Sequence, residues 1–381
     1  MIRKLVRSFV CSMLALAALV CTSLGADELP KLVLTSPTPY QVFQRESFEA
    51  ATSHDHHKFG PTMGYTDVVV EGSLPEGIKG QLEFRVTLVK PDSGPERGRK
   101  WMPLNAEFDG QSFHGPAEVN AGGWYRLAVR CVEDGKTLAE GSVEPFGVGE
   151  VFIVAGQSYA AGANDELLKV NDEQGRVSAY DVKTKKWQLA NDPQPNVGDG
   201  GTIWPALGDL LAPTLRVPVG FVNVAVGGTS TKQWMPEGDL HKQLVAAGHE
   251  IGTFRAVLWQ QGESDVIEKT TTETYIKNMN RIRESAARVW RFEPTWLLAK
   301  STLHPTVYND AESAKSEENI RNAIQQLWKR PHFAPGPDTD LLSGENRGDE
   351  KSRRHFSGIG QRRAALLWFV AVWNEIERQA R

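Results

Sequence analysis

The first third of the chain contains short runs in which apolar and polar residues alternate. Apolar residues occupy every second position from 82 to 88 and again from 125 to 131. Alternation with a period of two is typical of a strand with one face in a core. Turn-forming pairs such as Asp109-Gly110 and Asp134-Gly135 separate the runs. The pattern predicts an all-β sandwich over residues 31–147.

The pattern changes after a short join at 147–150. Near-continuous apolar runs, typical of parallel strands buried on both faces, occur at 151–155, 219–226, 256–259 and 296–301. Between the last two runs, Tyr275, Met279 and Ile282 begin a series at helical spacing, and an amphipathic helix is expected over about 358–378. Strands alternating with helices predict an α/β domain over 148–381, with a mostly parallel sheet covered on both faces.

Composition and charge mainly exclude classes of function. A chain of 381 residues is long enough for two domains. The formal net charge is −4 and there is no long basic run, which argues against a nucleic-acid-binding protein. The cluster His54-Asp55-His56-His57 contains side chains that bind transition metals. Because metal sites usually draw ligands from two segments and no second cluster lies nearby in sequence, we expect a solvated loop, no metal and no cofactor.

The N-terminal residues have the pattern of a targeting segment. Basic residues at 3, 4 and 7 precede an apolar run at 9–20 and small residues at 23–26, which predicts a signal peptide over residues 1–26. The apolar run is too short to span a bilayer, and Val20 is unfavourable before a lipid-modified Cys21. We therefore expect a secreted or periplasmic protein without a membrane anchor after cleavage. It would have no internal disulfide, because Cys131 would be its one remaining cysteine.

An abrupt strand end at Gly156-Gln157-Ser158 is the first candidate for chemistry. In an open α/β sheet, ligands bind at the carboxyl ends of the strands. A serine at a tight strand-to-helix turn is therefore a candidate nucleophile. Serine is also a common N-cap of a helix. This segment alone leaves both interpretations of Ser158 open.

Three later segments are predicted at the same edge of the sheet, and each supplies a group that acyl transfer requires. A serine hydroxyl needs an adjacent base, which His355 can supply, and the imidazole needs a carboxylate that fixes its tautomer. The developing oxyanion needs hydrogen-bond donors. The backbone N–H groups of Ser158 and Gly228 and the side-chain amide of Gln261 are the candidates. Together these segments favour the nucleophile interpretation of Ser158.

Four short blocks occur in a fixed order: Gly156-Gln157-Ser158-Tyr159, Gly227-Gly228-Thr229, Gln261-Gly262-Glu263 and His355-Phe356-Ser357. They resemble the SGNH (GDSL-like) hydrolase superfamily, and most closely its sialate O-acetylesterases and carbohydrate esterase family 6 acetylxylan esterases. Each block alone is weak evidence. Four blocks in family order within residues 148–381 are specific.

The resemblance implies a fold and a function. The fold is a flavodoxin-like three-layer αβα hydrolase domain, preceded here by the predicted sandwich, which resembles an immunoglobulin-like module. The function is that of a metal-free serine esterase that removes acetyl groups from a carbohydrate substrate through an acyl-enzyme intermediate. Carried over by position, Ser158 is the nucleophile and His355 the base, while Gly228 and Gln261 join the Ser158 amide as oxyanion donors.

Two positions depart from the family pattern. Tyr159 replaces the asparagine that usually follows the nucleophile, and we expect this change to alter the substrate pocket more than the chemistry. Many members carry the triad acid three residues before the histidine, where this chain has Ser352. Glu263 and Asp349 are the two substitutes. Glu263 is favoured because some family 6 esterases resemble this arrangement by taking their acid from the same block.

Several features keep alternatives open. Trp204 and Trp234 are candidates for stacking on sugar rings, although tryptophan in an α/β domain is more often part of the core. Arg347 either contacts an anionic sugar or is a solvated charge. The alternatives to a carbohydrate O-acetylesterase are a non-catalytic carbohydrate-binding protein with a degenerate hydrolase fold and a serine esterase for other short acyl groups.

Overall fold

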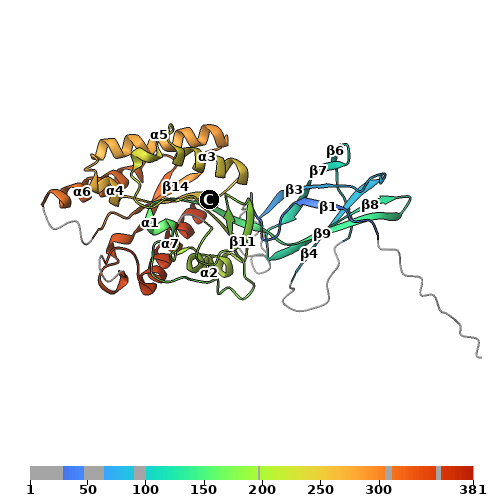
Figure 1. Ribbon diagram of the computed structural model, residues 1–381, viewed down its shortest axis with the longest axis horizontal. Coiled ribbons are helices and arrows are strands. Elements are labelled where there is room, and N and C mark those ends of the chain that lie inside the picture. Colours follow the sequence, from blue (N-terminus) through green and yellow to red (C-terminus); the bar gives the residue numbers. More distant parts are fainter. Residues whose placement is uncertain are drawn as a thin grey trace, which may run out of the picture.

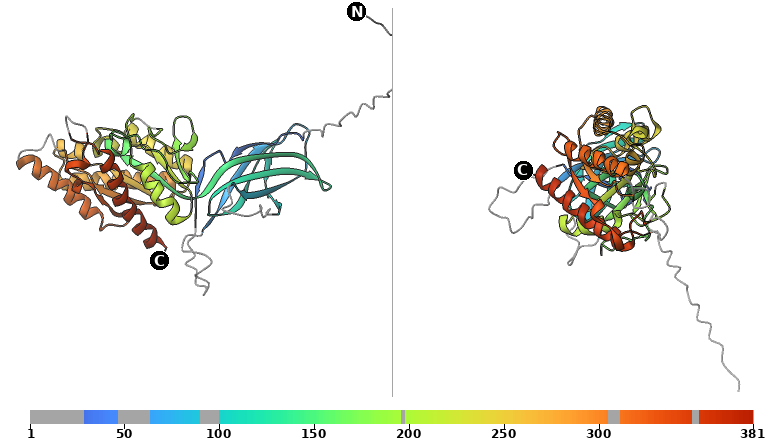
Figure 2. Two further views of the ribbon diagram at one scale, coloured as in Figure 1. Left: turned by 90° about the horizontal axis from the view of Figure 1, so that it is seen from below. Right: turned by 90° about the vertical axis from the view of Figure 1, so that its left-hand side faces the viewer.

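The computed structural model describes residues 29–46, 64–89, 100–195, 198–304, 311–348 and 353–380. The predicted signal peptide, the histidine cluster at 54–57, Ser352 and Asp349 lie outside these residues. The described chain forms an all-β region followed by a mixed α/β region (Figure 1). The two regions lie end to end along the longest axis of the molecule (Figure 2).

The all-β region contains two sheets. One has the order β1-β3-β7-β6, formed by β1 (Val33–Ser36), β3 (Tyr65–Ser73), β7 (Ser112–Asn120) and β6 (Glu107–Asp109). The other contains β2 (Val42–Gln44), β4 (Gln81–Leu88), β5 (Met102–Pro103), β8 (Trp124–Glu133) and the first part of β9 (Lys136–Gly156). Alternate side chains of β3, β4 and β7 are buried in one core that both sheets share, as their alternating sequence predicts.

A single long strand, β9, joins the two regions. It pairs with β8 as far as Gly147 and with β12 from Glu150 onward. The strand therefore changes partners at the predicted join without a break in the chain. Glycine at 149 permits this close approach, because a Cβ atom there would lie 2.0 Å from the carbonyl oxygen of Pro218.

The prediction of a mixed α/β fold after the join is confirmed. Its sheet has the order β11-β10-β12-β9-β13-β14-β15, and every pair of neighbouring strands is parallel except β11 and β10. The strands are β10 (Val177–Asp181), β11 (Lys186–Leu189), β12 (Val219–Asn223), β13 (Ala256–Gln260), β14 (Thr295–Lys300) and β15 (Phe333–Asp338). Counted from β9, the parallel core β12-β9-β13-β14-β15 has the order 2-1-3-4-5 of a doubly wound sheet.

Helices cover both faces of this sheet (Figure 1). On one face lie α2 (Trp204–Leu215) and α7 (Gly358–Gln379), and on the other α3 (Asp239–Ile251), α4 (Glu263–Ile267), α5 (Thr272–Trp290) and α6 (Ala311–Leu327). The described residues also contain four short helical turns: α1 (Ser158–Ala161), η1 (Thr231–Trp234), η2 (Thr339–Leu341) and η3 (Gly344–Asn346). None of the described helices is long and apolar enough to cross a membrane.

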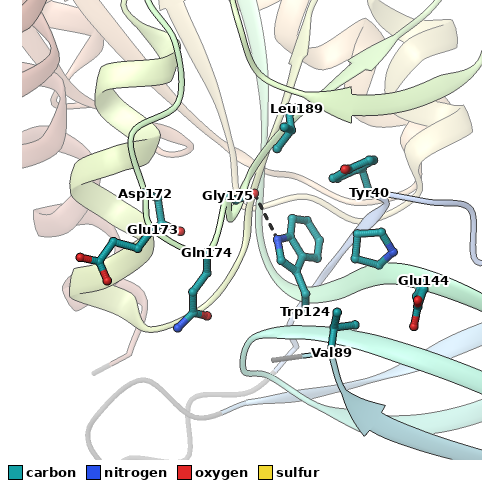
Figure 3. Close-up of a pocket in the computed structure, with 10 residues that line it drawn as sticks. Tyr40, Val89, Trp124, Glu144, Asp172, Glu173, Gln174, Gly175 and Leu189 are labelled. Atoms are coloured by element: carbon teal, nitrogen blue, oxygen red, sulfur yellow. Dashed lines mark hydrogen bonds between the residues drawn. The ribbon is translucent and has the colours of Figure 1, made fainter. Parts of the chain in front are cut away.

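A recess of about 510 Å³ lies where the two regions meet (Figure 3). Tyr40 and Trp124 line it from the all-β side, and residues 172–175 line it from the α/β side. The indole N–H of Trp124 donates to the Gly175 carbonyl across the junction at 3.1 Å. Trp124 pairs with Gly147 of β9, whereas Ser158 follows the end of β9 at Gly156. The recess and Ser158 therefore lie at opposite ends of the segment 147–156.

Candidate active site

Ser158 lies where β9 ends against β13. Gly156 has a φ of +127°, and a Cβ atom there would lie 2.1 Å from the Gln260 carbonyl oxygen, so glycine is needed for this sharp turn. Ser158 is the first residue of α1, and the N-cap position is occupied by Gln157. The capping interpretation is therefore excluded. Instead, Ser158 Oγ lies 2.9 Å from His355 Nε2.

The segment that carries His355 is held by hydrogen bonds to the backbone of His355 and Phe356. The His355 carbonyl accepts from Gly348 N at 2.8 Å. The N–H of Phe356 donates to Asn164 Oδ1 at 3.1 Å, and its carbonyl accepts from Asp165 N at 3.1 Å. The structure thus brings together two predicted residues that lie 197 positions apart in the sequence.

Gly228 lies in an exposed turn beside the nucleophile. It has a φ of +70°, and a Cβ atom on the preceding Gly227 would lie 3.6 Å from Ser158 Cβ. The buried side chain of Trp234 stabilises this turn, because its indole N–H donates to Thr229 Oγ1 at 2.9 Å. The role of Gly228 in an oxyanion hole stays a prediction.

Gln261 is close to these residues, but its side chain is part of a buried hydrogen-bond network. Its Nε2 group donates to Asp265 Oδ2 at 2.7 Å, to the Thr229 carbonyl at 3.1 Å and to Gln157 Oε1 at 3.3 Å. Its Oε1 atom accepts from the hydroxyl of Tyr275 at 3.1 Å. An amide has two hydrogens to donate. Gln261 can therefore bind an oxyanion only by giving up one of the longer internal contacts, and that role also stays a prediction.

Glu263 is the first residue of α4, and it is fully buried. Its carboxylate accepts from Gln157 Nε2 at 2.7 Å and from Arg354 Nε at 3.0 Å. Burial raises the pKa of the carboxyl to about 7, against the opposing effects of Arg354 and Arg347. Glu263 is thus bonded to the residue before the nucleophile and to the residue before the base. Because Asp349 is outside the described residues, the choice between the two acids stays a prediction.

Three residues that the sequence did not predict connect the predicted ones. Gln157 joins Glu263 to the Gln261 network, Arg354 binds Glu263, and Asn164 joins the carbonyl of Tyr159 to the His355 segment. Gln157 and Arg354 directly precede Ser158 and His355 in the sequence. This adjacency is the one signal that pointed to them.

The structure decides between the alternatives for three further side chains. Trp204 and Trp234 are fully buried, and the indole N–H of Trp204 donates to the Ala160 carbonyl behind the nucleophile. They belong to the core and do not form a sugar-stacking surface. Arg347 is also buried, and it donates to the carbonyls of Leu342, Thr339 and Arg354. It is therefore not a solvated charge.

Tyr159 does not line a pocket, contrary to the expectation that it shapes the substrate site. Its side chain is 1% exposed and lies beneath the His355 segment. Its ring meets the imidazole of His355 edge-on, with 5.2 Å between centroids, and packs on Phe356 at 4.7 Å. The residue after the nucleophile therefore contacts the base and not an open cavity.

The junction recess of Figure 3 has a different chemistry. Its described lining contains neither serine nor histidine. Two of its carboxylates are paired with arginines, Asp172 with Arg176 at 2.7 Å and Glu144 with Arg126 at 3.8 Å. The contact between Ser158 and His355, which lies beyond the C-terminal end of β9, suits nucleophilic chemistry.

Comparison with known proteins identifies a family model and a relative that are similar to part of this chain. Residues 148–292 match the family model described as a carbohydrate esterase, sialic acid-specific acetylesterase. A probable carbohydrate esterase of Arabidopsis thaliana is 30% identical over 168 residues, which cover 36% of this chain and 63% of the relative. The chain thus spans a little less than two thirds of that relative's length.

Two solved structures are similar to this chain. A carbohydrate acetylesterase from Xanthomonas citri is 16% identical with a TM-score of 0.51, over 91% of this chain and 74% of that one. A protein from Arabidopsis thaliana is 20% identical with a TM-score of 0.47, over 59% of this chain and 98% of that one. The first of these shows a shared mixed α/β fold.

Proposed function

We propose that this protein is an exported serine esterase of the SGNH hydrolase type that removes O-acetyl groups from carbohydrates. The observation that carries the proposal is the 2.9 Å contact between Ser158 Oγ and His355 Nε2 at the carboxyl edge of the parallel sheet. A serine hydroxyl hydrogen-bonded to an imidazole is the arrangement that activates serine for acyl transfer. The family match over residues 148–292 supports carbohydrate esters as the substrate class.

The proposed reaction has two halves. His355 Nε2 takes the proton of Ser158 as Oγ attacks the acetyl carbonyl, and the backbone N–H groups of Ser158 and Gly228, with Gln261, stabilise the oxyanion. His355 then gives the proton to the leaving sugar hydroxyl, which leaves an acetyl group on Ser158. Water, activated by the same imidazole, hydrolyses this ester and releases acetate. Glu263 is the proposed acid that orients His355.

The finer assignments are part of the same proposal. The sequence blocks and the family description support an O-acetylated sialic acid or an acetylated polysaccharide as substrate. The pattern of residues 1–26 supports export to the periplasm or the medium, with residues 31–147 as an immunoglobulin-like sandwich and 148–381 as the hydrolase domain. The reaction as written needs no metal ion.

Acetate release tests the proposal directly. A panel of acetylated glycans is incubated, without added metal, with the wild type, with Ser158→Ala and with Ser178→Ala, a control at a buried serine on β10. Ser158→Ala is expected to lower the rate by about 10⁶, the scale seen when a serine nucleophile is removed. Ser178→Ala is expected to stay within about twofold of the wild type, because its hydroxyl has no role in the reaction.

Three outcomes contradict the proposal in different ways. Wild-type rates in Ser158→Ala exclude the nucleophile. Binding of glycans without hydrolysis of any acetyl ester indicates a non-catalytic carbohydrate-binding protein. Faster hydrolysis of longer acyl chains than of acetyl indicates an esterase for other short acyl groups.

A further inference from the structure

The hydroxyl group of Tyr159 is bonded to the backbone immediately before the base. Tyr159 Oη donates to the carbonyl oxygen of Arg354 at 2.5 Å. Burial raises the pKa of this phenol well above its ordinary value, so the hydroxyl keeps its proton and acts as a donor. The residue after the nucleophile is therefore hydrogen-bonded to the residue before the base.

Arg347 holds the same carbonyl from a second direction. Its Nη1 atom donates to the Arg354 carbonyl at 2.9 Å and also to Tyr159 Oη. Its other nitrogens donate to the carbonyls of Leu342 and Thr339, which fix the guanidinium in place. The guanidinium also lies over the ring of Tyr159, with 5.3 Å to the ring centroid. Tyr159 and Arg347 thus form one unit around the Arg354 carbonyl.

This carbonyl controls the direction in which the His355 side chain leaves the backbone. The Arg354 carbonyl and the His355 N–H share one planar peptide group, so fixing the oxygen fixes that plane. The next plane is fixed as well, because the His355 carbonyl accepts from Gly348 N at 2.8 Å. With both planes held, the Cα–Cβ bond of His355 has one direction. The Tyr159 ring, 5.2 Å from the imidazole between centroids, then limits the rotation of the imidazole.

We propose that Tyr159, together with Arg347, is a positioning residue that places the His355 imidazole against Ser158. The inference rests on the proposed function and adds to it a role for a residue that departs from the family pattern. An asparagine side chain at 159 ends too close to the backbone to reach the Arg354 carbonyl along this path. Tyrosine here therefore couples the nucleophile segment and the base segment through one side chain.

The test compares the loss of two buried tyrosine hydroxyls. Tyr159→Phe keeps the ring beside His355 and removes the bond to Arg354. Tyr180→Phe is the matched control, because Tyr180 is also buried and its hydroxyl is hydrogen-bonded to Glu250. Tyr180 is in β10, away from the candidate site. Hydrolysis of p-nitrophenyl acetate gives kcat and KM. A fluorophosphonate gives the rate constant for labelling of the active serine and, at completion, the number of labels per chain.

We expect Tyr159→Phe to lower kcat by about 10- to 100-fold, since a misplaced catalytic group costs rates of this order. KM is expected to change less than about twofold, because no substrate contact is lost. The labelling rate constant should fall with kcat while the end point stays at one label per chain, and Tyr180→Phe should match the wild type within about twofold.

Several results overturn the inference. One is a kcat in Tyr159→Phe within about twofold of Tyr180→Phe. Another is a lower kcat that comes with fewer labels per chain at an unchanged labelling rate constant, because this indicates a misfolded fraction and not a misplaced base. A wild type that neither hydrolyses the ester nor labels with the fluorophosphonate refutes the proposed function itself and the inference with it.

Discussion

Arg354 connects the charge of the site with its geometry. Its backbone carbonyl is held by Tyr159 and Arg347, and its guanidinium binds the buried carboxylate of Glu263. Burial favours the neutral form of a carboxyl group, whereas a cation within hydrogen-bond distance favours the ionised form. Only an ionised carboxylate stabilises an imidazolium. The state of the proposed acid is therefore set by a competition between burial and Arg354.

This competition predicts a pH dependence. Burial raises the pKa of Glu263 to about 7, with Arg354 and Arg347 acting to lower it and Asp340 to raise it. Arg354→Gln removes one lowering charge, so the pKa of Glu263 rises further and the carboxylate becomes ionised only at higher pH. We expect the ratio of wild-type to variant kcat/KM to be about tenfold larger at pH 6 than at pH 9. The exposed neighbour Arg353, changed to Gln, is the control. A pH-independent ratio contradicts a catalytic carboxylate governed by Arg354.

The choice between the two acids is tested by charge removal without a change of size. If Glu263 orients His355, Glu263→Gln should lower kcat by about 10³- to 10⁴-fold, on the scale of replacing a triad carboxylate by its amide. Asp349→Asn should then stay within about tenfold of the wild type. Turnover of p-nitrophenyl acetate by both variants, with fluorophosphonate end-point labelling to count intact sites, gives the answer. A large loss in Asp349→Asn alone assigns the acid to that residue.

At the scale of elements, the sequence predicted the strands that are buried on both faces and missed those at the margins. The predicted runs at 151–155, 256–259 and 296–301 correspond to the end of β9, β13 and β14. Strand β15 has the sequence FAPGPD, and its prolines and glycine conceal it, since proline cannot donate to a sheet. The prolines are tolerated because β15 is an edge strand. The short hairpin of β10 and β11 gave no apolar run long enough to detect.

The same difference applies to the elements that form the site. Ser158, Gly228, Gln261 and His355 follow strand ends or precede a helix, positions that the pattern of apolar residues locates. The contacts of Tyr159 with Arg354 and of Asn164 with Phe356 span 195 and 192 positions. They depend on where the segment after β9 meets the His355 segment, and no local pattern carries that information. The expectation for Tyr159 was wrong for this reason.

At the scale of the whole molecule, strand β9 and a buried ion cluster contribute to the junction between the two regions. β9 pairs in both sheets, and Glu150 lies where it changes partners. The Glu150 carboxylate accepts from Arg45 Nε and from Arg255 Nε, both at 2.7 Å, and from Gln44 Nε2 at 3.1 Å. Arg45 directly follows β2 of the all-β region, and Arg255 directly precedes β13 of the α/β sheet. The cluster therefore joins three chain segments at the junction.

Removing the central charge of this cluster should loosen the junction without touching the chemistry. Glu150→Gln removes a fully buried carboxylate from its ion pairs with Arg45 and Arg255, so we expect the free energy of unfolding in urea to fall by about 3–5 kcal/mol. Glu312→Gln is the control, because Glu312 and its partner Lys269 are both more than half exposed. Loss of this ion pair should cost at most about 1 kcal/mol.

The effect of pH on stability provides a second check on the same variant. Burial alone would raise the pKa of Glu150, but Arg255 and Arg45 outweigh it and hold the pKa below its ordinary value. The wild type therefore loses this contribution to stability as the pH falls through the pKa of the folded state, whereas Glu150→Gln has no carboxyl to protonate there. The difference in stability between the two proteins should shrink on acidification, while kcat per labelled chain stays equal. A difference that is constant with pH contradicts an electrostatic role for Glu150 at the junction.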